Sequence, residues 1–168
     1  MSELPPAAQH PDKGRSVRDM FDAIAPRYDL LNAVLSLGVD RGWRRAAVRA
    51  ALAKRPSHVL DVATGTADLA LALKAARPEA EVTGADFAES MLTIGRGKAA
   101  RRKLDVELVA ADGTALPYPD VSFDTVTIAY GLRNFADVGA GLREFRRVLR
   151  PGGRLVVLEF PPPPKGPL

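Results

Sequence analysis

The sequence predicts an α/β fold, a doubly wound and mostly parallel sheet with helices packed against it. Between residues 58 and 160, short apolar runs of β type alternate with segments of helical periodicity. A turn of small residues joins the first apolar run to the first helix, and acidic or small residues stand at the ends of later runs. Sheets of this kind have right-handed crossovers and bind ligands at the carboxyl ends of their strands. We therefore expect a ligand site at that edge of the sheet.

The segment before the alternating region is predicted to be helical. Val17–Ala25 indicates a short helix that Pro26 interrupts, and Tyr28–Leu35 resumes the helical pattern. After a loop at Gly38, the stretch Gly42–Lys54 is predicted to be a helix that stops before the next proline.

The alternating region predicts five strands and the helices between them. The strands are expected at His58–Val62, Glu81–Asp86, Val106–Ala110, Phe123–Ala129 and Arg154–Phe160. The helices are expected at Ala67–Ala76, Glu89–Arg102 and Val138–Leu149, with Asp137 as the N-cap of the last. Pro151-Gly152-Gly153 is expected to end that helix, and the apolar run after it to be a strand buried on both faces. One domain over residues 15–160 follows, between a disordered tail at 1–14 and a proline-rich tail at 161–168.

Composition excludes several classes of function. The 168 residues include no cysteine, which removes disulfides, thiolate nucleophiles and cysteine-based metal sites and suits a cytoplasmic enzyme. No metal site is predicted. No apolar run approaches the roughly 20 residues of a membrane span, and the N-terminus lacks the apolar region of a secretory signal. Aromatic residues make up 6% and do not alternate with the basic runs, so a nucleic-acid partner is not expected.

The most informative motif is the stretch Val59–Leu69 together with one later aspartate. An apolar run ends in the small-residue turn around Gly65, a helical pattern follows, and the next strand ends at Asp86. Such a turn lets a ligand lie against backbone N–H groups, and an acid about 20 residues later can accept the hydroxyls of a ribose. The alternatives are a tight turn without a ligand and a helix N-cap at Asp86 or Ser90. We favour a cofactor that carries a nucleoside.

The glycine pattern narrows the choice of cofactor. A dinucleotide fingerprint needs three glycines, but Ala63, Gly65 and Ala67 occupy the alternate positions here. The lysine-containing loop that holds the phosphates of a nucleoside triphosphate is also missing. An NAD-dependent oxidoreductase is therefore the least supported function. S-adenosylmethionine has no phosphates and asks less of this turn.

Further motifs give the chain a family resemblance. They are Phe21–Asn32, Val59–Leu69, Asp86 with Ser90-Met91-Leu92, Ala111-Asp112-Gly113 through Leu116-Pro117-Tyr118, Tyr130–Asn134 and Leu149–Leu155. On them the chain resembles class I S-adenosylmethionine-dependent methyltransferases, and most closely the ubiquinone/menaquinone biosynthesis C-methyltransferases, over about Arg15–Phe160. The resemblance implies a Rossmann-like fold and methyl transfer from S-adenosylmethionine to a ring carbon of a polyprenyl quinol. In the bacterial menaquinone branch that lipidic acceptor is demethylmenaquinol.

The resemblance also implies cofactor-binding residues. Gly65 and Thr66 would lie beside the methionine part of S-adenosylmethionine, and Asp86 would accept both ribose hydroxyls. Asp61 would position the loop or the amino group of the cofactor. The remaining members of the set are Asp112 and Gly113 at the adenine edge and Ala129 at a strand end. An Asx-turn before the glycine is the competing interpretation of Asp112.

The acceptor side is predicted with its alternatives open. Asp29, Tyr130 and Arg133 are the candidate catalytic residues, and Tyr28 and Asn134 are further candidates. Asp29 could accept the quinol proton or could only pair with an arginine. Arg133 stays protonated, so it would stabilise a phenolate or orient a water rather than act as a base. The two histidines offer no obvious base.

Two surfaces suggest partners. Trp43 with Arg41, Arg44, Arg45 and Arg49 could form a basic amphipathic face against an anionic membrane surface, or a solvated helix face. Family members continue into an antiparallel hairpin, which is not expected here. The fifth strand should then expose an apolar edge and face, in a truncated product or beneath another chain in a homo-oligomer. We expect an intact cofactor site and an incomplete acceptor pocket. The competing functions are methylation of another small molecule, and binding of S-adenosylmethionine without turnover.

Overall fold

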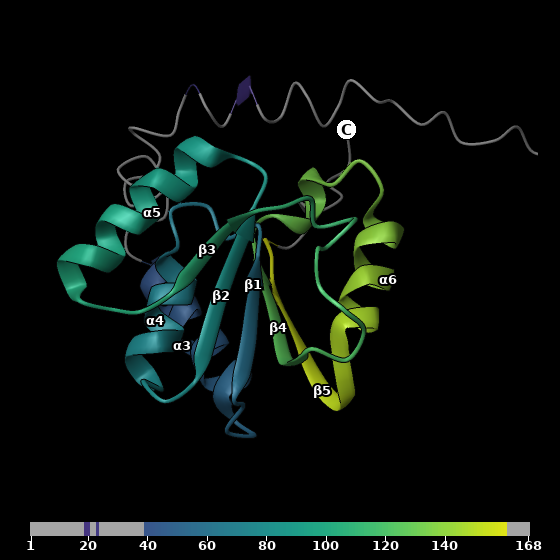
Figure 1. The fold of residues 1–168 in the computed structure, drawn as a ribbon, viewed down its shortest axis with the longest axis horizontal. Coiled ribbons are helices and arrows are strands. Elements are labelled where there is room, and N and C mark those ends of the chain that lie inside the picture. Colours follow the sequence, from purple (N-terminus) through teal and green to yellow (C-terminus); the bar gives the residue numbers. More distant parts are fainter. Residues whose placement is uncertain (1–18, 21–22, 24–38, 161–168) are drawn as a thin grey trace, which may run out of the picture.

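The computed structural model describes residues 19, 20, 23 and 39–160 (Figure 1). The three isolated residues are helical. The rest of the predicted helix Val17–Ala25, the predicted helix Tyr28–Leu35 and both predicted tails lie outside the described residues.

The described residues form one parallel sheet of five strands in the order β3-β2-β1-β4-β5. The strands are β1 (His58–Val62), β2 (Glu81–Asp86), β3 (Glu107–Ala110), β4 (Phe123–Ala129) and β5 (Leu149–Leu158). Residue Leu60 of the central strand pairs with Thr83 of β2 on one side and with Val126 of β4 on the other. The strands β2 and β3 are therefore added on one side of β1, and β4 and β5 on the other. This places the switch in strand order between β1 and β4.

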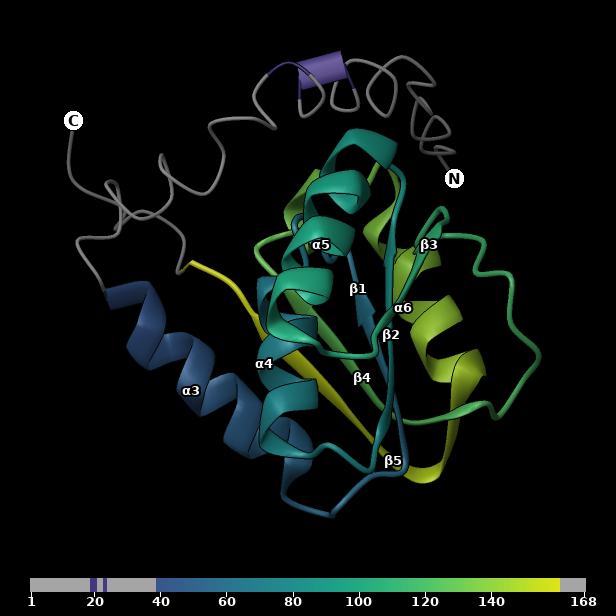
Figure 2. The ribbon, with the colours of Figure 1, turned by 60° about the vertical axis from the view of Figure 1, so that its left-hand side comes forward.

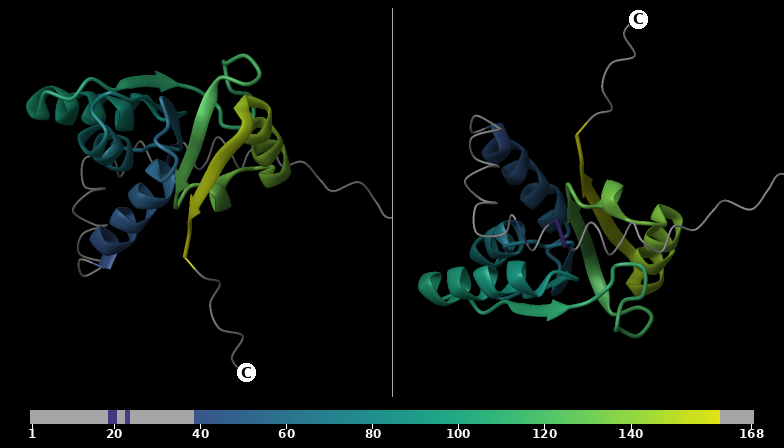
Figure 3. Two further views of the ribbon diagram at one scale, coloured as in Figure 1. Left: turned by 90° about the horizontal axis from the view of Figure 1, so that it is seen from below. Right: turned by 90° about the horizontal axis from the view of Figure 1, so that it is seen from above.

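Helices cover both faces of the sheet (Figures 2 and 3). One face carries α3 (Val39–Leu52), α4 (Asp68–Ala76) and α5 (Glu89–Arg102), which close an apolar core over β1 and β2. The other face carries α6 (Val138–Val148), whose Phe145 is fully buried against β1 and β4. A short 3-10 helix, η2 (Leu132–Asn134), follows β4. The predicted doubly wound α/β class is confirmed.

Most predicted boundaries agree with the structure. The strands β1, β2 and β4 and the helix α5 have the predicted limits, and Asp137 caps α6 by accepting from the backbone N–H of Ala140 at 2.9 Å. The helix α3 begins at Val39, before the predicted Gly42, and ends at Leu52. The helix α4 begins one residue late because Ala67 has a φ of 70° and only caps it. The 3-10 helix η2 was not predicted.

The predicted limits of β5 are wrong. The strand spans Leu149–Leu158, whereas the sequence predicts Arg154–Phe160. Pro151-Gly152-Gly153 therefore lies within the strand and does not separate it from a helix. The register jumps, because Phe123 pairs with Leu149 whereas Thr125 pairs with Arg154. The extra residues form a bulge in which Gly152 has a φ of 75° and a Cβ on Gly153 would lie 2.7 Å from the carbonyl O of Arg150.

The predicted burial of β5 on both faces is also wrong. Leu155 and Val157 are 37% and 43% exposed on the same side of the strand. Within the described sheet β5 is an edge strand, whose Leu149 packs into the core on the α6 side and whose Val156 and Leu158 pack into the core on the α3 side. The continuous apolar sequence could not distinguish this half-covered edge from a central strand. The expectation of an exposed apolar edge and face agrees with these two residues.

Candidate functional site

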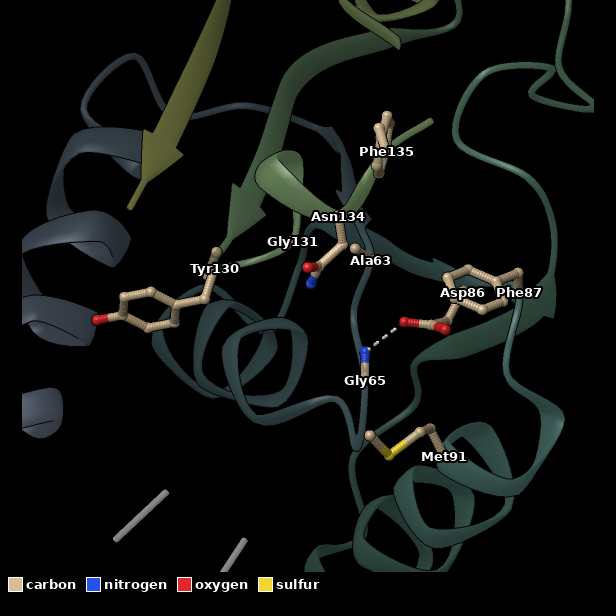
Figure 4. Close-up of a pocket in the computed structure, with 10 residues that line it drawn as sticks. Ala63, Gly65, Asp86, Phe87, Met91, Tyr130, Gly131, Asn134 and Phe135 are labelled. Carbon is tan, nitrogen blue, oxygen red and sulfur yellow. Dashed lines mark hydrogen bonds between the residues drawn. The ribbon is translucent and has the colours of Figure 1, made fainter. Parts of the chain in front are cut away.

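A pocket opens at the carboxyl ends of β1, β2 and β4 (Figure 4). Its empty volume, counted together with the open solvent at its mouth, is about 420 Å³. The loops after these strands and the start of α5 supply its lining residues, which are Ala63, Gly65, Asp86, Phe87, Met91, Ala129, Tyr130, Gly131, Asn134 and Phe135. The pocket therefore lies at the switch in strand order, where doubly wound sheets bind ligands.

The small-residue turn after β1 has an unusual backbone. Its alternate residues Ala63, Gly65 and Ala67 have φ values of 52°, 58° and 70°. The left-handed region suits glycine and costs about 1–2 kcal/mol for each other residue. Backbone hydrogen bonds hold the turn, from Thr64 N to the carbonyl O of Ala85 at 3.1 Å and from Ala67 N to that of Thr64 at 2.9 Å. Three alternate residues of the turn thus adopt the left-handed conformation that glycine usually provides, and two of them are alanines.

Asp86 joins this turn to the start of α5. Its Oδ2 accepts from the backbone N–H of Gly65 at 2.9 Å, and its Oδ1 accepts from that of Ala88 at 2.9 Å (Figure 4). The residue is 7% exposed and lines the pocket. A carboxylate has about four lone-pair positions and can therefore accept more than two hydrogen bonds. The predicted N-cap at Asp86 or Ser90 is wrong, because Ala88 is the N-cap of α5 and Asp86 only accepts from its N–H. The side chain also lies in the pocket, where ribose binding stays a prediction.

Asp61 lies beneath the turn and does not line the pocket. The side chain is buried between β1 and β4, where it accepts from Oγ1 of Thr127 at 2.6 Å and from Oγ1 of Thr64 at 2.7 Å. Burial raises the pKa of Asp61 to about 6, the two hydroxyl hydrogen bonds oppose that rise, and the negative charge of Asp86 adds to it. This carboxyl group therefore ties the turn to β4 through Thr64, as predicted for loop positioning.

Asp112 and Gly113 lie behind the pocket wall. Oδ1 of Asp112 accepts from the backbone N–H of Thr114 at 2.8 Å and from its hydroxyl at 2.7 Å, which is the predicted Asx-turn. A Cβ on Gly113 would lie 2.5 Å from Cζ of Phe135, a lining residue. The glycine thus permits the close packing that positions the phenyl ring, and a role of this pair in adenine binding stays a prediction.

An aromatic cluster adjoins the pocket on the side of α3 and β5. Tyr130, with a φ of 58°, stacks on Phe160 with the ring centroids 4.6 Å apart, and Phe160 contacts the edge of Trp43 at 5.8 Å. The guanidinium of Arg133 lies 5.4 Å from the Phe160 centroid and pairs with Glu159 at 3.6 Å. Figure 4 shows the Tyr130 ring directed away from Gly65. The hydroxyl end of this side chain therefore belongs to the cluster.

The predicted site residues fall into three groups. Four of them line the pocket, namely Gly65, Asp86, Ala129 and Tyr130, as does the further candidate Asn134, which points toward Gly65 (Figure 4). A second group lies near the pocket without lining it, namely Asp61, Thr66, Asp112, Gly113 and Arg133. Asp29 and Tyr28 lie outside the described residues.

Sequence reasoning did not predict that five further residues line the pocket, namely Ala63, Phe87, Met91, Gly131 and Phe135. One of them had a usable signal. A Cβ on Gly131 would lie 2.4 Å from Cβ of Ala63, so the glycine after β4 lets two loops touch. A glycine that follows a strand end opposite a small-residue turn indicates such a contact. The aromatic and methionine side chains gave no comparable signal.

Solved structures place the chain in a class of fold. The [4+2]-cyclase SpnF matches with a TM-score of 0.75 and 25% identity over 92% of this chain and 61% of its own. A SAM-dependent methyltransferase from Aquifex aeolicus matches with a TM-score of 0.59 and 25% identity over 66% of this chain and 61% of its own. The fold is thus the Rossmann-like methyltransferase fold. Because a cyclase also has it, the fold alone does not define the reaction.

Sequence relatives define the family. The chain belongs to the ubiE/COQ5 methyltransferase family, whose model matches residues 9–166. A demethylmenaquinone methyltransferase of Deinococcus radiodurans is 59% identical over 96% of this chain, and one of Thermus thermophilus is 64% identical over 88%. This chain spans 67% of the length of each. The predicted family and enzyme class, a methyltransferase, are confirmed.

Proposed function

We propose that the chain carries out S-adenosylmethionine-dependent C-methylation of a polyprenyl quinol ring, with demethylmenaquinol as the acceptor. The family membership and the names of the two bacterial relatives support this reaction. The observation that carries it is the pairing of Asp86 with the Gly65 N–H inside a pocket at the strand-order switch. That arrangement combines a ribose acceptor with a turn that a ligand can approach closely.

The lining of the pocket suits S-adenosylmethionine better than a dinucleotide. Among the described residues that line it there is no lysine or arginine, and the turn has one glycine where a dinucleotide fingerprint has three. Asp86 is the one charged side chain among the described lining residues, and it suits a ligand with hydroxyl donors and a positive sulfonium. S-adenosylmethionine, when bound, supplies a methyl group that its sulfonium has already activated.

The cofactor would contact residues on three loops. Asp86 accepts the ribose hydroxyls, and Phe87 and Met91 supply apolar walls beside it. Gly65 and Thr66 hold the methionine end, and Asp61 keeps their turn in place through Thr64. Asp112 and Gly113 support the adenine edge from behind Phe135, and Ala129 closes the floor. These residues bind and orient the reactant and exclude water, which is the main requirement of an in-line methyl transfer.

The acceptor would bind on the aromatic side of the pocket. A quinol ring is flat and apolar, and the stacked rings of Tyr130 and Phe160 lie next to the lining residues. Arg133, whose guanidinium lies over the Phe160 ring, would stabilise a developing phenolate. Asp29 is the proposed proton acceptor.

Membrane contact and self-association complete the proposal. In α3 the side chains of Arg41, Arg45 and Arg49 are exposed and Trp43 is 40% exposed, whereas Arg44 pairs with Asp68 at 3.6 Å. Three exposed cations beside an indole suit an anionic lipid surface, from which a lipidic quinol would arrive. No helix among the described residues is long and apolar enough to span a bilayer. The exposed edge of β5 would accept a second copy.

Turnover with purified demethylmenaquinol tests the reaction. The chain is incubated with the quinol and isotope-labelled S-adenosylmethionine, and mass spectrometry follows the label into menaquinol. Label on the ring supports the proposal. Cofactor binding without ring methylation contradicts it and favours either another small acceptor or a binding function without turnover.

The same assay with the quinol in anionic vesicles should be faster than in neutral vesicles, and equal rates contradict the membrane contact.

A further inference from the structure

Lys98 lies beneath the small-residue turn and is not among the residues that line the pocket. The side chain comes from α5 and is 12% exposed. Its Nζ donates to Oγ1 of Thr66 at 2.8 Å and to Oδ1 of Asp68 at 2.9 Å. An ammonium group has only donors, so both oxygens act as acceptors toward it. One cation thus ties the turn to the first residue of α4.

A close approach of α5 to the turn makes this contact possible. A Cβ on Gly95 would lie 3.1 Å from Cβ of Ala67 and 3.2 Å from the carbonyl O of Thr66. Glycine lowers the helix propensity of this segment, but its missing side chain lets the helix reach the turn. Lys98 lies three residues later and therefore on the same face of α5.

The turn needs support because its own capping is weak. Ala67, the N-cap of α4, has a φ of 70° and makes no side-chain capping hydrogen bond. The bonds from Lys98 are charge-assisted, which makes them stronger than bonds between neutral groups. Arg44 of α3 adds a second cation at 3.6 Å from Oδ2 of Asp68. The strained backbone is thus held from below by two helices, while Asp86 holds Gly65 from the side of the pocket.

We propose that Lys98 is a positioning residue for the cofactor. It fixes Thr66 and Asp68, and so keeps the turn in the conformation that presents Gly65 to the pocket. It acts through the turn, since it does not itself line the pocket. The proposal depends on the proposed function for the identity of the ligand, S-adenosylmethionine, but the contact with the turn is independent of it.

The test compares Lys98→Met with Lys74→Met in the full chain. Lys74 lies about two helical turns beyond Ala67, near the other end of α4, where its Nζ donates to the carbonyl O of Ala80 at 2.8 Å. Calorimetric titration should give a dissociation constant for S-adenosylmethionine about tenfold higher in Lys98→Met. In Lys74→Met the constant should change by less than about twofold, even if both variants lose similar thermal stability.

Hydrogen exchange gives a second readout that needs no ligand. The amides of residues 63–67 should exchange faster in Lys98→Met, relative to those of β1, but not in Lys74→Met. Thr66→Val removes one acceptor with little change of shape, and should reproduce the effect if Lys98→Met does not fold. Equal behaviour of the lysine variants in both readouts would overturn the proposal. Absence of binding by the unmodified chain would contradict the proposed function instead, and exchange would then decide the role of Lys98.

Discussion

The two ends of the sheet shift the pKa of an aspartate in opposite directions, upward for the buried Asp61 and downward for the half-buried Asp124. At the carboxyl ends of the strands, burial raises the pKa of Asp61 to about 6 despite the hydroxyls of Thr127 and Thr64. At the opposite end burial also acts on Asp124, but there the opposing interactions prevail. Hydrogen bonds from Arg150 and from the backbone N–H groups of His58 and Ser57, with the charge of Arg150, lower the pKa of Asp124.

The difference separates a binding end from a stabilising end. Around Asp124, the guanidinium of Arg150 in β5 and two backbone N–H groups at the start of β1 converge on one carboxylate, with Arg150 Nη1 at 2.9 Å. Within the described part of the chain no cation compensates the burial of Asp61, and the turn above it carries left-handed alanines. Strain and uncompensated charge collect where ligands bind. The strained turn and the buried Asp61 lower stability at the binding end, and interactions such as those of Asp124 raise it at the opposite end.

The largest expected effect is on binding at the carboxyl end. Asp86→Ala should weaken S-adenosylmethionine binding about 100-fold, because it removes the proposed acceptor of the ribose hydroxyls and the partner of the Gly65 N–H. Isothermal calorimetry measures it, with Asp86→Asn as the control that keeps the shape and should bind with intermediate affinity. Undiminished affinity in the alanine variant would mean that the binding end lies elsewhere.

The next effect is on stability at the opposite end. Asp124→Ala should lower the free energy of unfolding by about 2 kcal/mol at pH 7, since the N–H groups of Ser57 and His58 and the guanidinium of Arg150 lose their shared acceptor. The folded pKa lies below the ordinary value, so this contribution is present above about pH 4 and is lost as the pH falls further. Urea denaturation measures it. Cofactor affinity should stay unchanged, and a parallel loss would break the comparison.

A close contact between two loops gives a third test. Gly131→Ala should cost about 1–3 kcal/mol of stability, because its Cβ would lie 2.4 Å from that of Ala63. Backbone strain contributes nothing, since Gly131 has a φ of −106°. The double variant with Ala63→Gly should recover most of the loss and relieve the φ of 52° at Ala63. Additive thermal shifts in the two variants would exclude the contact as the cause.

The smallest expected effect is a gain in stability. Asp61→Asn should raise the free energy of unfolding by about 1–2 kcal/mol at pH 7.5, because it removes a buried charge and retains hydrogen-bonding atoms. In the unmodified chain the raised pKa means that the contribution of Asp61 is full below about pH 3.8 and is lost as the pH rises through about 6. The advantage of the variant should therefore shrink as the pH falls toward 4. A constant advantage across that range would contradict the raised pKa.

The sequence predicted the frame of the molecule well because local signals determine it. Short apolar runs bounded by glycine, proline and acidic residues gave the limits of three strands and one helix. The same signals failed at β5, where Pro151-Gly152-Gly153 forms a bulge within the strand. A bulge depends on the neighbouring strand, which periodicity along one segment does not record. The predicted burial of Leu155 and Val157 was wrong for the same reason, because it also depends on the neighbouring elements.

The site was predictable where its residues lie next to strand ends. Gly65, Asp86, Ala129 and Tyr130 follow from spacing and small residues, and all line the pocket. Phe87, Met91 and Phe135 are ordinary apolar residues in sequence, and only packing makes them walls. The contact of Lys98 with a turn about 30 residues earlier is a matter of tertiary structure.

One titration tests the central claim, that the carboxyl end of the sheet is a site for S-adenosylmethionine. The unmodified chain and Asp124→Ala are each titrated with S-adenosylmethionine and, separately, with NADH in an isothermal calorimeter. We expect both proteins to bind S-adenosylmethionine with the same micromolar-range affinity and to give no binding heat with NADH. Binding of NADH, or absence of S-adenosylmethionine binding by the folded chain, would contradict the account.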